Sequence, residues 1–178
     1  ISNLERNFPQ DQKSLYEISE SMKQLIERTS DTVSRISTEL RPGLLDELGL
    51  IAAIEWHLEE FLKRTSIKCK QTIQIHDRVL DKELSTAIFR VFQETLTNIA
   101  RHSQASKMEI KFFESDGKIR LDVKDNGIGI SEHNIDNSKS FGLLGIREMI
   151  HHLGGEYQIS GKKGKGTKVS ATFPIIEN

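Results

Sequence analysis

Four polar residues stand where their spacing would place them on one face of an otherwise apolar helix. They occupy positions i, i+4, i+7 and i+8 and are Glu94, Asn98, Arg101 and His102, and residues at these separations share a helix face. A carboxylate and an amide oxygen one turn apart can hold a hard cation such as Mg²⁺, or its waters. Arg101 and His102 add donors suited to phosphate. A solvated helix face is the simpler explanation of such a stripe taken alone.

The segment from Asp125 to Ile130 combines a carboxylate with two glycines, directly after a strand-like pattern. Because glycine carries no side chain, Gly127 and Gly129 would let the backbone approach a flat ligand closely. The Asp125 carboxylate can accept a hydrogen bond from an exocyclic amine, such as adenine N6. An ordinary Asn-Gly turn explains the same residues, and a short glycine motif does not separate the two explanations.

Two more glycine clusters occur further along the chain. The first runs from Phe141 to Gly145 and opens a helix pattern, where backbone N–H groups and the helix dipole favour an anion. The alternative is a flexible hinge, and the pattern is neither a Walker A loop nor a dinucleotide fingerprint. The second runs from Gly164 to Thr167, and Thr167 could hydrogen-bond a base or a water held by Asp125. Its alternative is a turn with a solvated lysine cluster, made of Lys162, Lys163, Lys165 and Lys168.

Hydrophobic periodicity predicts the elements that must position these clusters. The expected order is a helix within 13–40, a helix at 45–63, a strand at 66–75, a helix at 81–101, strands at 107–114 and 118–124, a loop at 125–142, a helix at 144–153, and strands at 157–160 and 167–173. Asp81 is the expected N-cap of the third helix. Adjoining strands with helices available for one face predict an α+β fold, a two-layer α/β sandwich with a mixed sheet, preceded by a helical segment.

The helical segment within 13–40 carries a narrow apolar seam on a polar helix. The seam recurs at alternating steps of three and four and consists of Leu15, Ile18, Met22, Leu25, Thr29, Val33, Ile36 and Leu40. Such a heptad-like stripe suits a helical hairpin or bundle. It could also be the flank of a globular core. Because this helix has few local partners in the chain, we expect it to associate with a second chain.

Composition excludes several classes of protein. The chain has 178 residues and a formal net charge of -1, which argues against binding nucleic acid through bulk charge. The sequence contains no run of about 18 apolar residues, so it predicts no transmembrane helix. The single cysteine, Cys69, excludes an internal disulfide and a cysteine-based zinc site, and favours a reducing, cytoplasmic setting. Because the chain starts at Ile1, we expect it to be a piece of something longer.

The four clusters together, in this order, resemble the GHKL ATP-binding superfamily over about residues 67–175. That superfamily includes gyrase, the ninety-kilodalton heat-shock chaperone, mismatch-repair ATPases and histidine kinases. Within it, the chain looks like a bacterial two-component sensor histidine kinase. The more specific resemblance is to a subfamily whose linker carries Glu-Leu-Arg-Pro, here residues 39–42, and Leu-Gly-Leu, here residues 48–50.

This resemblance implies a role for each cluster. Residues 93–102 resemble the family's N box, 125–130 its first glycine box and 142–155 its second. Asn98 would be the Mg²⁺ ligand, and Glu94 would polarise a water or position the metal through one. Asp125 would anchor adenine, and residues 131–141 would form a lid over ATP. The implied ATP-binding set is Asn98, Arg101, His102, Asp125, Gly127, Gly129, Ile130, Gly142, Leu143, Leu144, Gly145 and Thr167.

The resemblance also implies an activity and an organisation. Residues 1–43 would be part of a dimerisation hairpin with its second helix at about 13–40, 44–65 a connecting helix, and 66–178 the ATP-binding catalytic domain. The implied reaction passes the ATP γ-phosphoryl to a histidine and then to an aspartate on a response-regulator receiver domain. Residues 1–40 contain no histidine, so the phosphoacceptor is expected on a helix upstream of this chain. The chain itself would then bind ATP without phosphorylating itself.

Three alternatives remain beside the kinase prediction. The ATP site could belong to a serine/threonine kinase of the anti-sigma-factor type, or to another ATPase module of the superfamily, such as a chaperone or topoisomerase part. From a different class, the chain could be a scaffold that dimerises without nucleotide. The apolar seam and the Arg41-Pro42 linker disfavour the anti-sigma-factor kinase.

Overall fold

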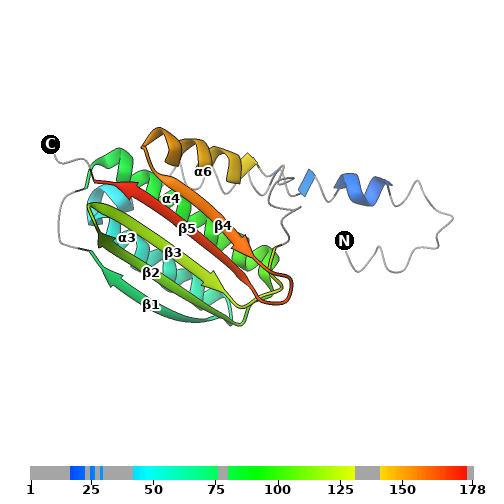
Figure 1. Cartoon of the computed structure of the whole chain (residues 1–178). Helices are drawn as coiled ribbons and strands as arrows, with labels where there is room; N and C mark the ends of the chain where they lie inside the picture. The colour runs from blue at the N-terminus through cyan, green and yellow to red at the C-terminus, as the bar shows by residue number, and fades with distance from the viewer. Residues whose placement is uncertain are drawn as a thin grey trace. The chain divides into compact units, whose positions relative to one another are not determined.

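The computed structural model describes residues 17–22, 25–26, 29, 42–75, 80–130 and 141–175. The chain divides into two compact units, Ile1–Pro42 and Gly43–Asn178. The second unit contains the sheet and all the predicted clusters, and Figure 1 shows it as a sheet with helices on one face. The predicted hairpin of residues 1–43 falls mostly outside the described residues and stays a prediction.

The sheet of the second unit has five strands in the order β1-β2-β3-β5-β4. Their bounds are Lys68–Gln74 for β1, Lys107–Ser115 for β2, Lys118–Asp125 for β3, Glu156–Gly161 for β4 and Thr167–Pro174 for β5. β1 pairs with β2 in parallel, and every other neighbouring pair is antiparallel. The parallel pair requires a crossover, which the helix between the two strands supplies. The predicted mixed sheet is confirmed.

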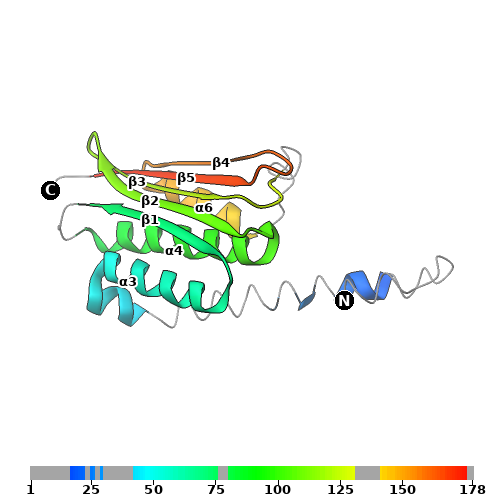
Figure 2. The same cartoon turned by 90° about the horizontal axis from the view of Figure 1, so that it is seen from below.

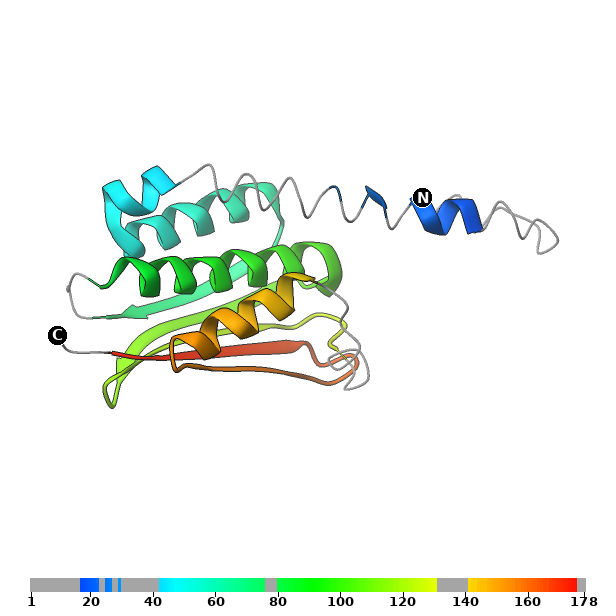
Figure 3. The same cartoon turned by 90° about the horizontal axis from the view of Figure 1, so that it is seen from above.

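Three helices pack on one face of this sheet, as Figures 2 and 3 show. They are α3 (Pro42–Arg64), α4 (Lys82–Asn98) and α6 (Phe141–His152), and the short π-helical turn η1 (Ile99–Ser103) continues α4. The opposite face of the sheet has no helix over it among the described residues. This arrangement confirms the predicted two-layer α+β sandwich.

Asp81 caps α4, because its carboxylate accepts hydrogen bonds from the backbone N–H groups of Glu83 (2.9 Å) and Leu84 (3.3 Å).

The core forms where the apolar face of α4 meets the inward side of the sheet. Burying each large side chain contributes about 1.5–3 kcal/mol. The largest fully buried side chains include Phe92, Phe112, Phe173, Ile88, Leu96, Ile110 and Leu121.

Two predicted chain reversals are confirmed, and their geometry explains them. The turn between β2 and β3 places Asp116 at φ 52° and Gly117 at φ 69°, the pair of positive φ angles that a tight hairpin needs. α6 ends at His152, Gly154 follows with φ 68°, and Gly155 donates its N–H to the Ile150 carbonyl at 2.9 Å. This is the glycine-dependent helix stop that the sequence indicated.

His57 of α3 is half-buried. Its ring lies edge-on to Phe89 (centroids 5.7 Å apart) and to Phe92 (6.0 Å) of α4. The imidazole therefore serves as an aromatic packing residue between two helices.

The predicted helix at 45–63 contains a sharp kink in the structure. Gly49 has φ 77° and ψ 173°, a backbone conformation that is open almost only to glycine. A Cβ at this position would meet nothing within 4 Å. The kink therefore depends on backbone freedom rather than on crowding, and hydrophobic periodicity does not register it.

We expect Gly49→Ala to lower the free energy of unfolding by about 1–3 kcal/mol, because alanine is strained at this φ and ψ. Urea unfolding followed by circular dichroism measures the change. The matched control is Gly145→Ala, at a regular position in α6 where a Cβ also meets nothing. That control should gain stability, by up to about 1 kcal/mol, and an equal effect of both substitutions would contradict the account of the kink.

Candidate functional site

The predicted clusters converge at one end of the sheet. The last residues of β3 and β4, the first of β5, the end of α4 with η1, and the start of α6 all lie there (Figure 3). These segments are far apart in the sequence. The fold therefore assembles the site from element ends, and the assembly depends on how closely those ends pack.

The Asp125 side chain is held at the end of β3, with only 4% of its surface exposed. Its Oδ1 accepts the backbone N–H of Gly127 at 2.7 Å. Among the described residues, none donates a hydrogen bond to Oδ2. The carboxylate is thus fixed through one oxygen and retains the other as an acceptor for a ligand amine.

Asn126 fixes the loop that follows Asp125. Its Oδ1 accepts the backbone N–H groups of Ser106 (3.0 Å) and Lys107 (2.9 Å), and its Nδ2 donates to the Ser106 hydroxyl at 3.1 Å. The side-chain amide therefore ties the loop after β3 to the start of β2. The sequence allowed an Asn-Gly turn as one explanation of this segment, and the structure shows a bend at Gly127 and Ile128.

Gly127 lets the loop pack directly on the end of η1. A Cβ on Gly127 would lie 2.0 Å from the Ser103 carbonyl oxygen. The same oxygen accepts the backbone N–H of Ile128 at 2.8 Å. The absence of a side chain at Gly127 thus permits a backbone contact within the protein. The sequence had instead suggested that glycine is needed here for the close approach of a ligand.

The turn between β4 and β5 packs on the same loop from the other side. A Cβ on Gly129 would lie 2.1 Å from the Lys162 carbonyl oxygen, and a Cβ on Gly166 would lie 1.9 Å from the Asp125 carbonyl oxygen. Gly164 donates its N–H to the Ile128 carbonyl at 2.7 Å. Together with Gly127, the glycines at 129 and 166 therefore allow three backbone segments to meet in one place.

The first glycine box also exposes a side chain outside the predicted ATP-binding set. Ile128 is 48% exposed, between glycines that are packed on both sides. Ile130 is half-buried, and its Cγ2 would lie 2.9 Å from a Cβ on Gly161 of β4. The signal for Ile128 in the sequence is its place between the two glycines, and its exposure follows from their packing.

Thr167 lies next to Asp125 across the sheet. The antiparallel register of β3 and β5 ends with Lys124 opposite Lys168, and one further step places Thr167 opposite Asp125. Thr167 is half-buried at the start of β5. This position agrees with the expected pairing of the Thr167 hydroxyl and the Asp125 carboxylate around one ligand or water.

Glu94 and Asn98 form a hydrogen-bonded pair on α4. Asn98 Nδ2 donates to Glu94 Oε1 at 3.1 Å, and both side chains are half-buried. This donation leaves the amide oxygen of Asn98 as an acceptor or metal ligand. The Glu94 charge also affects a buried neighbour, Tyr157 on β4. Burial raises the pKa of Tyr157, the Glu94 carboxylate raises that pKa further, and Arg147 of α6 lowers it.

The helix around Arg101 and His102 departs from the predicted α-helical stripe. Residues Ile99–Ser103 form a π-helical turn, which has more residues per turn than an α-helix and changes the direction of the side chains that follow Asn98. Arg101 and His102 are both exposed. The turn ends at Gln104 in a left-handed conformation (φ 54°), and the pattern of apolar residues carried no sign of this change.

The second glycine box, residues 142–155, begins in the first turn of α6 and runs past its end. The backbones of Gly142, Leu143 and Leu144 are helical, and their side chains lie outside the described residues, as do residues 131–140 of the predicted lid. A Cβ on Gly145 would meet nothing within 4 Å. Packing among the described residues therefore does not require glycine at position 145, unlike positions 127 and 129.

A divalent cation would find few ligands in the protein itself. Among the described residues, no group of three or more His, Cys, Asp or Glu could hold a metal ion. The pair on α4 offers the Glu94 carboxylate and the Asn98 amide oxygen. This donor set suits Mg²⁺ bound mainly through water and ligand phosphates, because that ion usually takes only one or two protein ligands at such sites.

Comparison with known proteins decides the family. The sequence profile of the histidine kinase-, DNA gyrase B- and HSP90-like ATPases matches residues 83–177, the region that contains every cluster described above. The chain belongs to this ATPase family. The predicted superfamily is confirmed, and ATP binding follows as the property of the domain.

The curated relatives point to one branch of the ATPase family. The chain is 35% identical over 148 residues to the sensor histidine kinase MctS of Rhizobium johnstonii, which covers 82% of this chain and 32% of the relative. It is 29% identical over 170 residues to the oxygen sensor histidine kinase NreB of Staphylococcus carnosus, with 96% and 49% covered. The chain thus spans half or less of these relatives. They favour the histidine kinase branch over the anti-sigma-factor alternative.

Solved structures support the fold. The histidine kinase domain of a blue-light-activated kinase from Erythrobacter litoralis matches with a TM-score of 0.61 and 24% identity, covering 71% of this chain and 61% of that one. The sensor histidine kinase MprB from a mycobacterium matches with a TM-score of 0.54 and 19% identity, covering 68% and 91%. Both likenesses concern the sandwich of sheet and helices.

We expect Gly127→Ala to destabilise the ATPase domain, because its Cβ would collide with the Ser103 carbonyl. Steric strain of this kind costs about 1–3 kcal/mol, and urea unfolding measures it. Gly164→Ala is the matched control, since Gly164 has φ 74° and open space around the Cβ position. The control carries backbone strain alone, so a loss at Gly127 no larger than at Gly164 would contradict the packing role.

Proposed function

We propose that this chain is the ATP-binding catalytic part of a sensor histidine kinase. The observation that carries the proposal is the meeting, at one end of an ATPase-family sheet, of the buried Asp125 carboxylate and the Glu94–Asn98 pair. The first group suits a purine amine and the second suits a cation on phosphates. A site that holds both ends of ATP is what a phosphoryl transferase requires.

Asp125 anchors the base in this proposal. Its Oδ2 accepts the adenine N6 amine, while the Gly127 N–H on Oδ1 holds the carboxylate in place. The exposed Ile128 side chain offers an apolar surface to the purine ring, and Thr167 supplies a hydroxyl opposite Asp125. A hydrogen bond between the buried Asp125 carboxylate and a ligand amine discriminates against purines that lack the amine.

Asn98 and Glu94 serve the phosphate end. The Asn98 amide oxygen would hold Mg²⁺, and Glu94 would position the same ion through water. The ion would supply positive charge that offsets the charge of the phosphates. Arg101 and His102 follow on η1 and add exposed donors next to this pair. The N–H groups at the start of α6 provide further anion contacts.

The rest of the reaction lies with parts beyond this ATPase domain. The γ-phosphoryl passes to a histidine imidazole and from there to an aspartate of a response-regulator receiver domain. We place that histidine on a helix upstream of this chain, because residues 1–40 contain none.

A cytoplasmic location stays a prediction. Among the described residues, no helix is both long and apolar enough to cross a membrane.

We expect Asn98→Ala to weaken binding of a non-hydrolysable ATP analogue by at least about tenfold in the presence of Mg²⁺. With EDTA in place of Mg²⁺ the two proteins should bind alike, because the substitution removes a metal ligand. Isothermal titration calorimetry measures both conditions. Thr97→Ala is the control, since the Thr97 hydroxyl only donates to the Gln93 carbonyl at 2.9 Å.

Two results would contradict these assignments. Unchanged affinity of Asn98→Ala with Mg²⁺ would remove the metal role from Asn98. Failure of the unaltered chain to bind any ATP analogue would favour the scaffold that dimerises without nucleotide. Asp125→Ala tests the contact with the base separately from the metal site. It should weaken binding both with and without Mg²⁺, because the proposed contact of Asp125 with adenine does not involve the ion.

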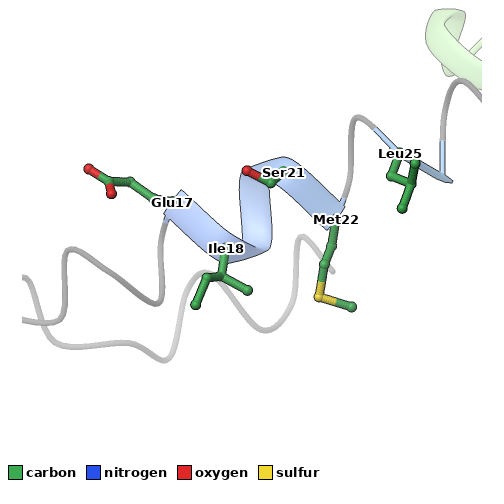
Figure 4. Close-up of a pocket in the computed structure, with 5 residues that line it drawn as sticks. All are labelled: Glu17, Ile18, Ser21, Met22 and Leu25. Atoms are coloured by element: carbon green, nitrogen blue, oxygen red, sulfur yellow. The ribbon is translucent and has the colours of Figure 1, made fainter.

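We also propose that the first unit forms a homodimer through its helical seam. Residues 17–22 are helical, and Ile18 and Met22 are 55% and 54% exposed, with Leu25 at 65%. Figure 4 shows Ile18 and Met22 pointing to the same side of the helix. An exposed stripe of large apolar side chains at heptad-like spacing is stabilised when a second helix covers it.

We expect Ile18→Glu combined with Met22→Glu to convert the dimer to a monomer, because both substitutions place charge in the proposed seam. Sedimentation velocity measures the mass. Glu20→Lys changes the charge of the same helix about half a turn away from Ile18, and it should leave the dimer intact. A monomeric unaltered chain, or a dimer that survives the double substitution, would argue against the seam.

A further inference from the structure

Three lysines occupy the turn that packs on the Asp125 loop. Lys162, Lys163 and Lys165 belong to the link between β4 and β5, whose Gly164 N–H donates to the Ile128 carbonyl at 2.7 Å. The Lys162 carbonyl lies against Gly129. The backbone contacts that form the site therefore also fix the Cα positions of these three lysines beside the loop that begins at Asp125.

These lysines make no visible contribution to the fold. All three are exposed, and among the described residues none of their ammonium groups forms a salt bridge. By contrast, the described lysines elsewhere include several with carboxylate partners, such as Lys82 with Asp46 at 3.0 Å and Lys168 with Asp122 at 3.2 Å. The turn itself is shaped by Gly164 and Gly166, both with positive φ.

The three charges stand out against the balance of the whole chain. The formal net charge is -1, while three of the four residues at 162–165 are lysines that form no salt bridge among the described residues. Like charges this close repel one another and reduce stability slightly. A small stability cost at the rim of a ligand site is typical of residues retained for function.

We propose that Lys162, Lys163 and Lys165 guide anionic nucleotides into the site by electrostatic attraction. The proposal rests on the proposed function, because it takes the triphosphate as the ligand. Charges act over about 8 Å at physiological ionic strength, and the backbone of this turn is held against the loop that begins at Asp125. Fixed charges around a cleft raise association rates of charged ligands by 10-fold or more.

Guidance of this kind has a kinetic signature that direct contact lacks. The association rate constant should rise with ligand charge in the order AMP, ADP, ATP, and it should fall steeply as salt is added. The dissociation rate constant should depend little on the lysines, because solvent and salt largely screen the interaction of exposed charges with the bound nucleotide. The lysines would thus favour highly charged nucleotides over less charged competitors at encounter.

The test is stopped-flow binding of fluorescent methylanthraniloyl derivatives of ATP, ADP and AMP to the full chain. The variant replaces Lys162, Lys163 and Lys165 with glutamine. At low salt, the association rate constant for the ATP derivative should fall about threefold or more, with a smaller fall for ADP and the least for AMP. The salt dependence should become shallower, and the dissociation rate constant should stay within about twofold.

A matched control changes the same total charge elsewhere. Lys82, Lys111 and Lys118 are exposed lysines that lie on the first turn of α4, in the middle of β2 and at the start of β3. Lys82 and Lys118 are at the ends of their elements that lie away from the site. Their replacement by glutamine should leave association rates nearly unchanged, and thermal unfolding should show that the turn variant is as stable as the unaltered chain, or more so.

Each outcome decides the matter. Equal association rates in the turn variant and the unaltered chain would overturn electrostatic guidance while leaving the nucleotide site intact. A change confined to the dissociation rate would assign the lysines to direct contact and would likewise overturn guidance. If the unaltered chain binds none of the three nucleotides, the proposed function fails, and guidance fails with it.

Discussion

Close packing of backbone on backbone is the constraint on which the site depends. The loop after β3 sits between the end of η1 and the turn of β4 and β5, and each contact passes through a glycine whose Cβ would collide with a carbonyl oxygen at about 2 Å: Gly127, Gly129 and Gly166. Hydrogen bonds from Ile128 and Gly164 then hold the three segments together. A side chain at any of these glycines would separate elements that carry different parts of one site.

This packing joins the two ends of the proposed ligand site. Asp125 belongs to the loop, while Glu94 and Asn98 belong to the helix that ends in η1, and the Ser103 carbonyl connects the two through Ile128. The same packing brings the lysine-bearing turn beside Asp125. Anchoring of the base, cation binding and electrostatic guidance therefore all depend on one region of irregular backbone at the end of a regular sheet.

Much of the architecture was predictable, because local rules decide it. Alternating and helical apolar patterns predicted the described strands and helices to within about three residues, and the Asp81 cap and Gly117 turn followed from local hydrogen bonding and backbone freedom. The kink at Gly49 and the π-helical turn at Ile99–Ser103 were not predictable in this way. Both leave the apolar periodicity intact and change only the backbone path, which a pattern of side chains does not record.

By itself, the sequence determined the order of the elements, the four polar and glycine-rich clusters, and a specific resemblance to one ATPase superfamily. Only the tertiary structure decided that Gly127 and Gly129 are required by contacts within the protein, that Ile128 is exposed, and that the lysine turn lies beside Asp125. The physical reason is separation along the chain. Contacts between residues 103 and 128, or 128 and 164, leave no local pattern, because they arise only when the packed core brings distant element ends together.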